Sequence, residues 1–104
     1  MKKVLEIYLD NMKFAIGNVA ITNGVDDLIQ ENEDFRKFVS KSFCRHCNGD
    51  WGDMCEEDKA MNESALANGD DRLFSKYDFN EDISIYIITE WDRSVTTVLF
   101  PEEY

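Results

Sequence analysis

The residues best equipped for chemistry lie together in the segment 44–58, "CRHCNGDWGDMCEED". These fifteen positions hold all three cysteines, the only histidine and five carboxylates. Thiolates and imidazole bind zinc, a cysteine beside a histidine can act as an activated nucleophile, and carboxylates bind hard cations. The segment is therefore weighed as a zinc site, as a catalytic cluster, and as a structural turn that leads into an acidic surface.

The metal-ligand spacing in this segment is poor. Structural zinc usually takes two paired ligand sets, whereas Cys44 and Cys47 form the single Cys-x-x-Cys pair and Cys55 stands alone. If a helix ends here, the adjacent residues His46 and Cys47 point roughly 100° apart. No register of the segment supplies the oxygen ligands, glycine and glutamate of an EF-hand loop. We expect no resident metal or cofactor, and packed, reduced thiols instead.

Catalysis is also disfavoured by the pattern. Neighbouring residues on a helix do not align as a Cys–His dyad, and neither an oxyanion motif nor a phosphate loop is present. A nuclease-like pair of His46 with Asp50 or Asp92 would have to hold a polyanion against a net charge of −11. We therefore expect no enzymatic activity. The alternative is a Cys/His or metal-dependent hydrolase centred on His46.

The glycines favour the structural interpretation. Trp51 lies between Gly49 and Gly52, which predicts an indole that locks a tight turn between two helices, while Asp50 or Asp53 accepts hydrogen bonds from the free amides of the turn. His46, at the end of the preceding helix, is interpreted as a packed structural histidine. We expect it to hydrogen-bond the turn and to interact favourably with the helix dipole.

A second polar cluster lies near the C-terminus, in the predicted hairpin around residues 90–94. Asp92 and Ser94 are expected to satisfy turn amides, and Arg93 to pair with Glu90 or with the C-terminal acids. The other interpretation is a polar hairpin tip on which Trp91 and Arg93 anchor an interface. The structural interpretation is favoured.

The charge is divided unevenly along the chain. Residues 1–47 hold seven acidic and seven basic residues, whereas residues 48–104 hold 15 acidic and four basic ones, so the whole excess of −11 lies in the second part. Such a field repels nucleic acid and attracts basic surfaces. It is equally consistent with acidity that serves solubility alone.

Two helices are expected to position these residues. In the segment 32–46 the residues Phe35, Phe38, Val39 and Phe43 recur at helical spacing and predict one buried stripe. The segment 54–69 reads as a second helix, in which Met54, Met61 and Ala65 share a face with Leu66 beside it. Residues 25–29 are expected to form one short helical turn.

Strands account for the rest of the chain. One is predicted at 14–22, which ends at the Asn23-Gly24 turn signal, and the last three are predicted at 72–79, 83–91 and 95–100. Residues 1–10 are a further candidate for an edge strand. The short connections between the last three strands favour an antiparallel meander. The chain is therefore expected to be a single α+β domain over 1–104, an antiparallel sheet of about four strands with two helices packed on one face.

The N-terminus gives the localisation. "MKKVLEIYLDN" begins like a signal peptide, but Glu6 and Asp10 interrupt the apolar stretch and no small-residue cleavage site follows. An odd number of cysteines fits reduced thiols. We expect a cytoplasmic protein that does not bind membranes.

Several motifs together resemble a family. "FAIGNVAITNGV", "RHCNGDWGD", "NESALANGDDRLFSKY" and "IYIITEWDRSVTTVLFPEEY" are similar, in this order, to small uncharacterised "plasmid-related" proteins of bacterial plasmids, phages and conjugative elements. The family pattern, His-x-x-Gly-Asp-Trp-Gly followed by Ile-Thr-Glu-x-Asp-Arg-Ser-x-Thr-Thr, falls here on residues 46–52 and 88–97. Its structural positions would be His46, Gly49, Asp50, Trp51, Gly52, Glu90, Asp92 and Arg93. The cysteines are not part of the pattern, and Asn23-Gly24 stands where relatives tend to have Pro-Gly.

The resemblance sharpens the expected function. Small acidic proteins of mobile elements often block host defence, and an acidic surface can imitate DNA phosphates in a basic channel. We expect a non-enzymatic protein-binding module, with an anti-CRISPR or antirestriction inhibitor as its sharpest version and a basic surface of a host protein as its partner. A structural or regulatory homodimer, in which the Arg36, Lys37 and Lys41 face meets an acidic face, is the third alternative. The residues expected to bind the partner are Asp53, Glu56, Glu57, Asp58, Asp70, Asp71, Asp78, Glu81 and Asp82.

Overall fold

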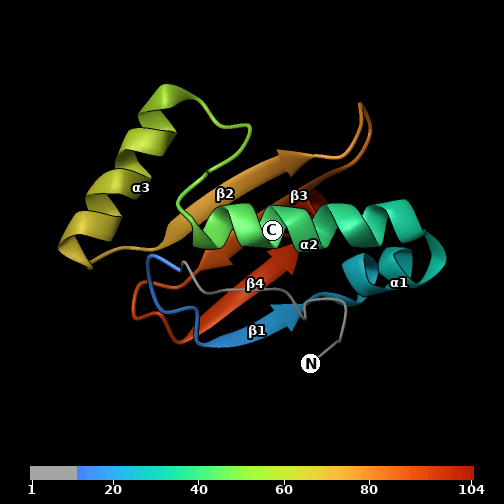
Figure 1. Ribbon diagram of the computed structural model, residues 1–104, viewed down its shortest axis with the longest axis horizontal. Helices are drawn as coiled ribbons and strands as arrows, with labels where there is room; N and C mark the ends of the chain where they lie inside the picture. The colour runs from blue at the N-terminus through green and yellow to red at the C-terminus, as the bar shows by residue number, and fades with distance from the viewer. Residues whose placement is uncertain (1–11) are drawn as a thin grey trace.

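The computed structural model describes residues 12–104 and shows an α+β fold (Figure 1). In chain order the elements are β1 (Asn18–Ile21), α1 (Asn23–Glu31), α2 (Glu33–Cys47), α3 (Glu56–Asn68), β2 (Leu73–Asp78), β3 (Ser84–Thr89), β4 (Val95–Leu99) and the 3-10 turn η2 (Pro101–Glu103). The candidate strand at 1–10 lies outside the described residues. None of the helices in the described part of the chain is both long enough and apolar enough to cross a membrane.

The sheet is mixed, so the prediction of a purely antiparallel sheet was wrong. Its strand order is β1-β4-β3-β2, and β2, β3 and β4 form the expected antiparallel meander. Strand β1, however, pairs in parallel with β4, with Asn18 opposite Val95 and Ile21 opposite Val98. Two hairpins reverse the chain twice, so β4 runs in the direction of β2. The helical connection brings the chain back to the end of the sheet where β1 began, and such a crossover makes strands parallel.

The first helix begins where the sequence indicated a turn. Thr22 accepts a hydrogen bond from the amide of Val25 through its hydroxyl, which caps α1, and Asn23-Gly24 form its first residues. The helix has nine residues rather than a single turn, and it buries Val25 and Ile29, which lie four residues apart on one face.

Helix α2 matches its prediction closely. Asn32 caps it by accepting from the amide of Phe35 at 3.0 Å, and Phe35, Val39 and Phe43 are at most 1% exposed. Together with α1, this stripe covers one face of the sheet (Figure 1). The sheet residues of this core are Tyr77, Ile85, Ile87 and Val98, which lie at alternate positions of their strands.

Helix α3 lies beyond the β2 edge of the sheet instead of covering its face (Figure 1). The predicted apolar face of this helix was right for Ala65, which is buried with Leu66 packed beside it, but wrong for Met61, which is 65% exposed while Asn62 is buried in its place. The side chain of Asn62 explains the rotation of the helix. Its amide donates to the carbonyl of Phe74 at 2.7 Å and accepts from the Phe74 amide at 3.1 Å, as a neighbouring strand would.

The loop before α3 closes the rest of this edge. The Lys76 amide donates to the carbonyl of Trp51 at 3.3 Å, the Asp53 amide donates to the carbonyl of Lys76 at 2.7 Å, and the Asp78 amide donates to the Asp53 carboxylate at 3.0 Å. An open strand edge invites pairing with other chains, and these contacts leave less of the β2 edge open to such pairing.

Candidate functional site

His46 is fully buried between α2 and the sheet. Its Nδ1 lies 2.6 Å from the hydroxyl of Ser75, and its Nε2 lies 2.9 Å from the hydroxyl of Thr89. The rings of Phe14 and Trp51 pack edge-on against the imidazole at centroid distances of 5.4 and 5.7 Å. The predicted packed histidine is confirmed, but it bonds strand hydroxyls rather than the turn.

The hydroxyls behind His46 determine where its proton lies. Thr96 donates its single hydroxyl hydrogen to the carbonyl of Ile16 at 2.8 Å, so it must accept from Thr89, which lies 2.8 Å away. Thr89 then has no hydrogen left for His46 and accepts from Nε2–H. Nδ1 is therefore the unprotonated nitrogen, and it accepts from Ser75.

This environment holds the imidazole neutral. Burial lowers the pKa of His46 to about 3, because the charged form would lose its hydration. The expected interaction with the helix dipole is therefore wrong, since a neutral ring carries no charge for it. Both ring nitrogens are occupied and the side chain is 0% exposed, so a hydrolase centred on His46 would have no accessible base in this conformation.

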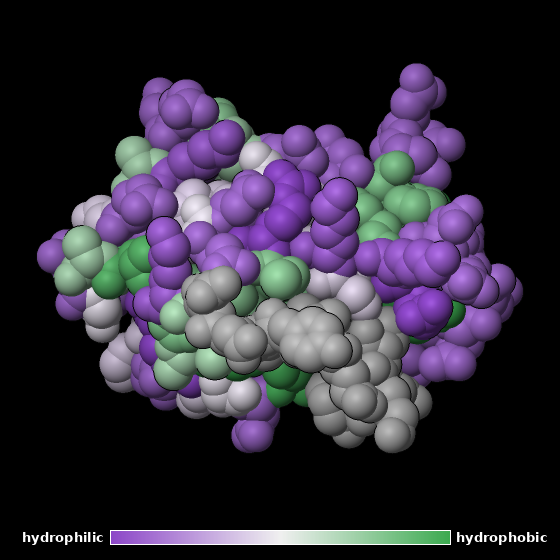
Figure 2. All heavy atoms as spheres, viewed as in Figure 1, coloured by the Kyte–Doolittle hydropathy of each residue, from purple (hydrophilic) through white to green (hydrophobic). Residues whose placement is uncertain are grey.

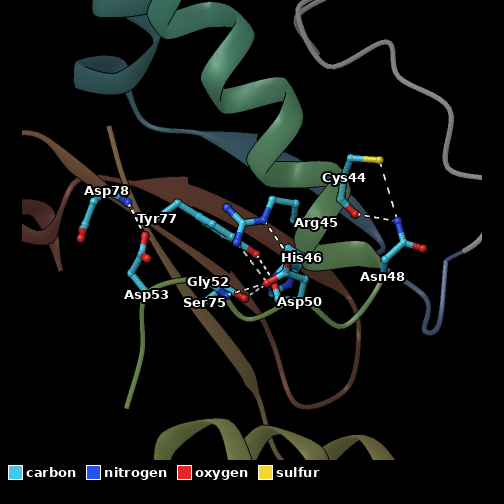
Figure 3. Close-up of polar contacts among 10 residues, drawn as sticks. All are labelled: Cys44, Arg45, His46, Asn48, Asp50, Gly52, Asp53, Ser75, Tyr77 and Asp78. Atoms are coloured by element: carbon cyan, nitrogen blue, oxygen red, sulfur yellow. Dashed lines mark hydrogen bonds and ion pairs between the residues drawn. The ribbon is translucent and has the colours of Figure 1, made fainter. Parts of the chain in front are cut away.

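The turn after α2 is held by a bidentate ion pair between Arg45 and Asp50 (Figure 3). Nε of Arg45 lies 2.7 Å from Asp50 Oδ2 and its terminal nitrogen 3.2 Å from Oδ1, which also accepts from the Gly52 amide at 3.2 Å. The hydrogen bond from Arg45 lowers the pKa of Asp50. The Arg45 guanidinium stacks on Tyr77, whose hydroxyl donates to the carbonyl of Asp50. These contacts confirm Asp50 as an acceptor for one amide of the turn, that of Gly52.

Trp51 locks the same turn to α3. Its indole is 3% exposed and donates to the Glu63 carboxylate at 2.7 Å. Asp53 does not cap α3 as expected, because its carboxylate accepts from Asp78 instead and Cys55 occupies the cap position without a side-chain hydrogen bond. The Gly-Asp-Trp-Gly segment thus fastens the end of α2 to β2 and to α3.

The three cysteines are free thiols with different surroundings. Cys47 is buried, Cys44 is half-buried and Cys55 is exposed. Burial raises the pKa of Cys47 to about 12, which keeps this thiol protonated and unreactive. Within residues 12–104, no group of three or more His, Cys, Asp or Glu side chains is placed to hold a metal ion.

Arg93 in the β3–β4 turn binds backbone rather than acids. It has a positive φ of 61°, and its guanidinium donates to the carbonyls of Asp71, Glu90 and Trp91 at 2.7, 3.1 and 3.2 Å and to that of Ala65 at 3.3 Å. The expected pairing with Glu90 therefore reaches the main chain and not the carboxylate. Asp92 accepts from the Ser94 amide as predicted, while Trp91 remains 62% exposed.

The nine acidic residues expected to bind a partner are all exposed. They form three groups, which lie before and in the first turn of α3, in the α3–β2 turn, and around the β2–β3 turn. The third group protrudes at the upper right of Figure 1, and Figure 2 shows hydrophilic residues at the same place. The groups are Asp53, Glu56, Glu57 and Asp58; Asp70 and Asp71; and Asp78, Glu81 and Asp82.

Few of these carboxylates are neutralised by the protein itself. Lys59 lies 3.6 Å from Glu56, and Lys76 lies 3.3 Å from Asp78. The other seven have no ion-pair partner among residues 12–104. Arg36 and Lys37, proposed for a homodimer contact, lie 3.9 and 3.3 Å from Glu33 of their own helix.

An open pocket of about 480 Å³ lies between α3 and the second face of the sheet, which is the face opposite to the one that α1 and α2 cover. Sequence reasoning missed it, because it depends on how α3 is placed against β2. All three of its acids, Asp53, Asp58 and Asp71, belong to the nine. The period-2 positions of Phe74 and Tyr86 were the only signal of its aromatic wall. The principal lining residues are Asp58, Met61, Asp71, Phe74, Lys76 and Tyr86.

Comparisons with known proteins identify no relative. No protein-family model matches the chain, and neither the curated proteins nor the solved structures contain a significant match.

Proposed function

We propose that this protein is an acidic, non-enzymatic module that binds a basic surface of another protein. The resemblance to proteins of mobile elements suggests the sharper version, an anti-CRISPR or antirestriction inhibitor that acts in the cytoplasm of a bacterial host by nucleic-acid mimicry. One observation carries the proposal: nine carboxylates of the second part of the chain are exposed, and seven of them have no ion-pair partner among the described residues.

The spacing of these groups suits a nucleic-acid-binding channel. The first group and the α3–β2 turn group lie at opposite ends of the 13-residue helix α3, which is roughly 20 Å long. A DNA strand places one phosphate every 3.4 Å or so, therefore the acids extend over the length of several phosphates. Lysines and arginines that hold a phosphate backbone would meet carboxylates instead, and the attraction would weaken with added salt.

The experiment uses two baits with the same net charge. The test variant is Glu56→Gln/Glu57→Gln/Asp58→Asn in the first turn of α3. The control is Asp27→Asn/Glu31→Gln/Asp34→Asn on α1 and α2, where the acids are also exposed. Proteins captured from a bacterial host lysate by the native chain and by each variant are identified, and each captured protein is then tested for DNA competition.

The proposal expects a DNA- or RNA-binding protein that the native chain and the control retain and that the test variant releases. Its affinity for the test variant should be about tenfold lower, because three weak ion pairs of about 0.5 kcal/mol each are lost. Nucleic acid should compete for it. A partner retained equally by both variants, or one that binds DNA undisturbed in the presence of this protein, would contradict mimicry.

A further inference from the structure

The pocket between α3 and the second face of the sheet is a built feature of the molecule. One wall is the side of α3 that carries Asp58 and Met61, and the other is formed by Phe74, Lys76 and Tyr86. Asn62 joins the two walls through its pair of hydrogen bonds to the Phe74 main chain. Because the walls are bonded to each other, the pocket is formed before any ligand arrives.

We infer that this pocket receives an arginine side chain of the protein partner, together with the apolar residues beside that arginine. This inference rests on the proposed function, and it names the point at which the acidic surface recognises its partner. The volume of about 480 Å³ exceeds what one side chain fills and lies in the usual range for ligand pockets.

The aromatic wall already holds a guanidinium of this chain. The Arg72 guanidinium carbon lies 5.3 Å from the ring centroid of Phe74 and 5.4 Å from that of Tyr104. The Tyr86 ring packs against Phe74 at a centroid distance of 4.7 Å, so the aromatic surface extends into the pocket beyond the ring that Arg72 covers. Stacking of a guanidinium on such faces is favourable when water is displaced.

The charges of the lining favour a cation. Three lining acids, Asp53, Asp58 and Asp71, meet two lining cations, Arg72 and Lys76. Both cations are already engaged, since Arg72 stacks on the rings and Lys76 lies 3.3 Å from Asp78. Asp58 and Asp71 have no ion-pair partner in the described part of the chain. Asp58 lies in the first turn of α3 and Asp71 lies beyond its last turn, so an incoming guanidinium would donate its hydrogen bonds to one of these two carboxylates and not to both.

The exposed methionine at the rim fits an apolar neighbour of this arginine. Met61 is 65% exposed, although the helix could have buried it in place of Asn62. Met54 also lines the pocket. Methionine side chains are flexible and adapt to differently shaped partners. The exposed fraction of Met61 contributes nothing to folding, and it is accounted for if a partner covers it.

The inference is tested by nuclear magnetic resonance on the isotope-labelled full chain. The probe is a blocked tripeptide with arginine between two leucines, and the control peptide carries citrulline, which has the same shape without the charge. The pocket variant is Asp58→Asn/Asp71→Asn. The matched variant is Glu81→Gln/Asp82→Asn in the β2–β3 turn, which changes the net charge equally outside the pocket.

The expected result is that the arginine peptide shifts the amide signals of α3, β2 and β3. Its dissociation constant should rise about tenfold with citrulline and in the pocket variant, while the matched variant binds as the native chain does. Thermal unfolding of each variant checks that the fold is retained, and Asp58→Asn alone replaces the double variant if it does not fold.

Three results would overturn the inference. These are an absence of shifts at the pocket, equal binding of the citrulline peptide, and shifts spread evenly over all acidic groups. None of these results decides the outcome of the capture experiment, because that experiment compares the acids of α3 with those of α1 and α2. Conversely, the pocket could bind the arginine peptide while the captured partners bind the test and control variants equally. That result would contradict nucleic-acid mimicry and leave the arginine site standing.

Discussion

Nε2 of His46 donates a hydrogen bond to the hydroxyl of Thr89, which lies 2.9 Å away. The direction of this bond is imposed by Thr96, whose own hydroxyl donates to the main chain and therefore accepts from Thr89. The carbonyl of Ile16 can only accept, so each hydroxyl that leads to it has a fixed role. The histidine of the conspicuous Cys/His segment is thereby assigned to the core. Within residues 12–104, the described contacts give it no role at the surface.

The first prediction concerns the proton on His46. At neutral pH, nitrogen-detected resonance spectra should show the Nε2–H form, with Nδ1 unprotonated. In a Thr96→Val variant the hydroxyl of Thr89 loses its acceptor. Thr89 is then free to donate to His46, so the tautomer of His46 is no longer fixed. Observation of the Nδ1–H form in the native protein would contradict the assigned directions.

The second prediction concerns stability in mild acid. The unfolded chain protonates His46 near its ordinary pKa of 6.5, whereas the folded protein resists protonation down to about 3. Between these values the unfolded state binds more protons, so the free energy of unfolding falls as pH decreases, by up to about 1.4 kcal/mol per pH unit. Urea unfolding of native protein and His46→Gln between about pH 5 and 7, above the main carboxylate titrations, should show this slope only in the native protein. Equal slopes would contradict the burial of a neutral imidazole.

The third prediction concerns Gly52. A Cβ at this position would lie 2.0 Å from the carbonyl oxygen of Lys76, and the φ of 79° disfavours any side chain. We expect Gly52→Ala to lower the free energy of unfolding by at least about 3 kcal/mol. Gly69→Ala is the matched control, since Gly69 has a similar φ of 66° but no atom within 4 Å of the added Cβ. Its loss should be only about 1 kcal/mol, and an equal loss in the two variants would rule out the steric explanation.

The fourth prediction concerns Asn62, which completes the edge of β2. Asn62→Ala leaves the amide and carbonyl of Phe74 without their partners, at a cost of about 1–3 kcal/mol, and it opens the strand edge to other chains. Asn68→Ala removes only an exposed side-chain contact to Ser64 and should change stability by less than about 0.5 kcal/mol. Denaturant unfolding and light scattering measure the two effects. An Asn62→Ala protein as stable and monodisperse as the control would show that α3 does not protect the edge.

The fifth prediction concerns Arg93. Its planar guanidinium reaches four carbonyls, which a lysine ammonium cannot do, so Arg93→Lys should cost about 1–2 kcal/mol. Arg36→Lys, at a long ion pair with an exposed Glu33, should stay within about 0.5 kcal/mol of the native protein. Thermal unfolding of both variants provides the comparison. Equal midpoints would mean that Arg93 does not hold the hairpin to α3.

The helical stripe of Phe35, Val39 and Phe43 and the meander of β2, β3 and β4 were predictable because they depend on local periodicity and short connections. The parallel pairing of β1 was not, because its partner strand lies far away in the sequence. The buried face of helix α3 was predicted incorrectly for a related reason. Its apolar residues favoured burial of Met61, but the unpaired main chain of β2 offered Asn62 two hydrogen bonds, and these rotate the helix.

The sequence by itself determined the α+β composition, the positions of helices α2 and α3 in the chain, the turn built on Gly49, Asp50 and Trp51, and the concentration of negative charge after residue 47. These follow from residue types and near neighbours in the chain. Only the tertiary structure decided that β1 pairs with β4, that His46 is neutral and bonded to a row of hydroxyls, and that an open pocket forms between α3 and the sheet face opposite α1 and α2. Each of these depends on atoms brought together from distant parts of the chain, where the need to satisfy buried polar groups outweighs local preference.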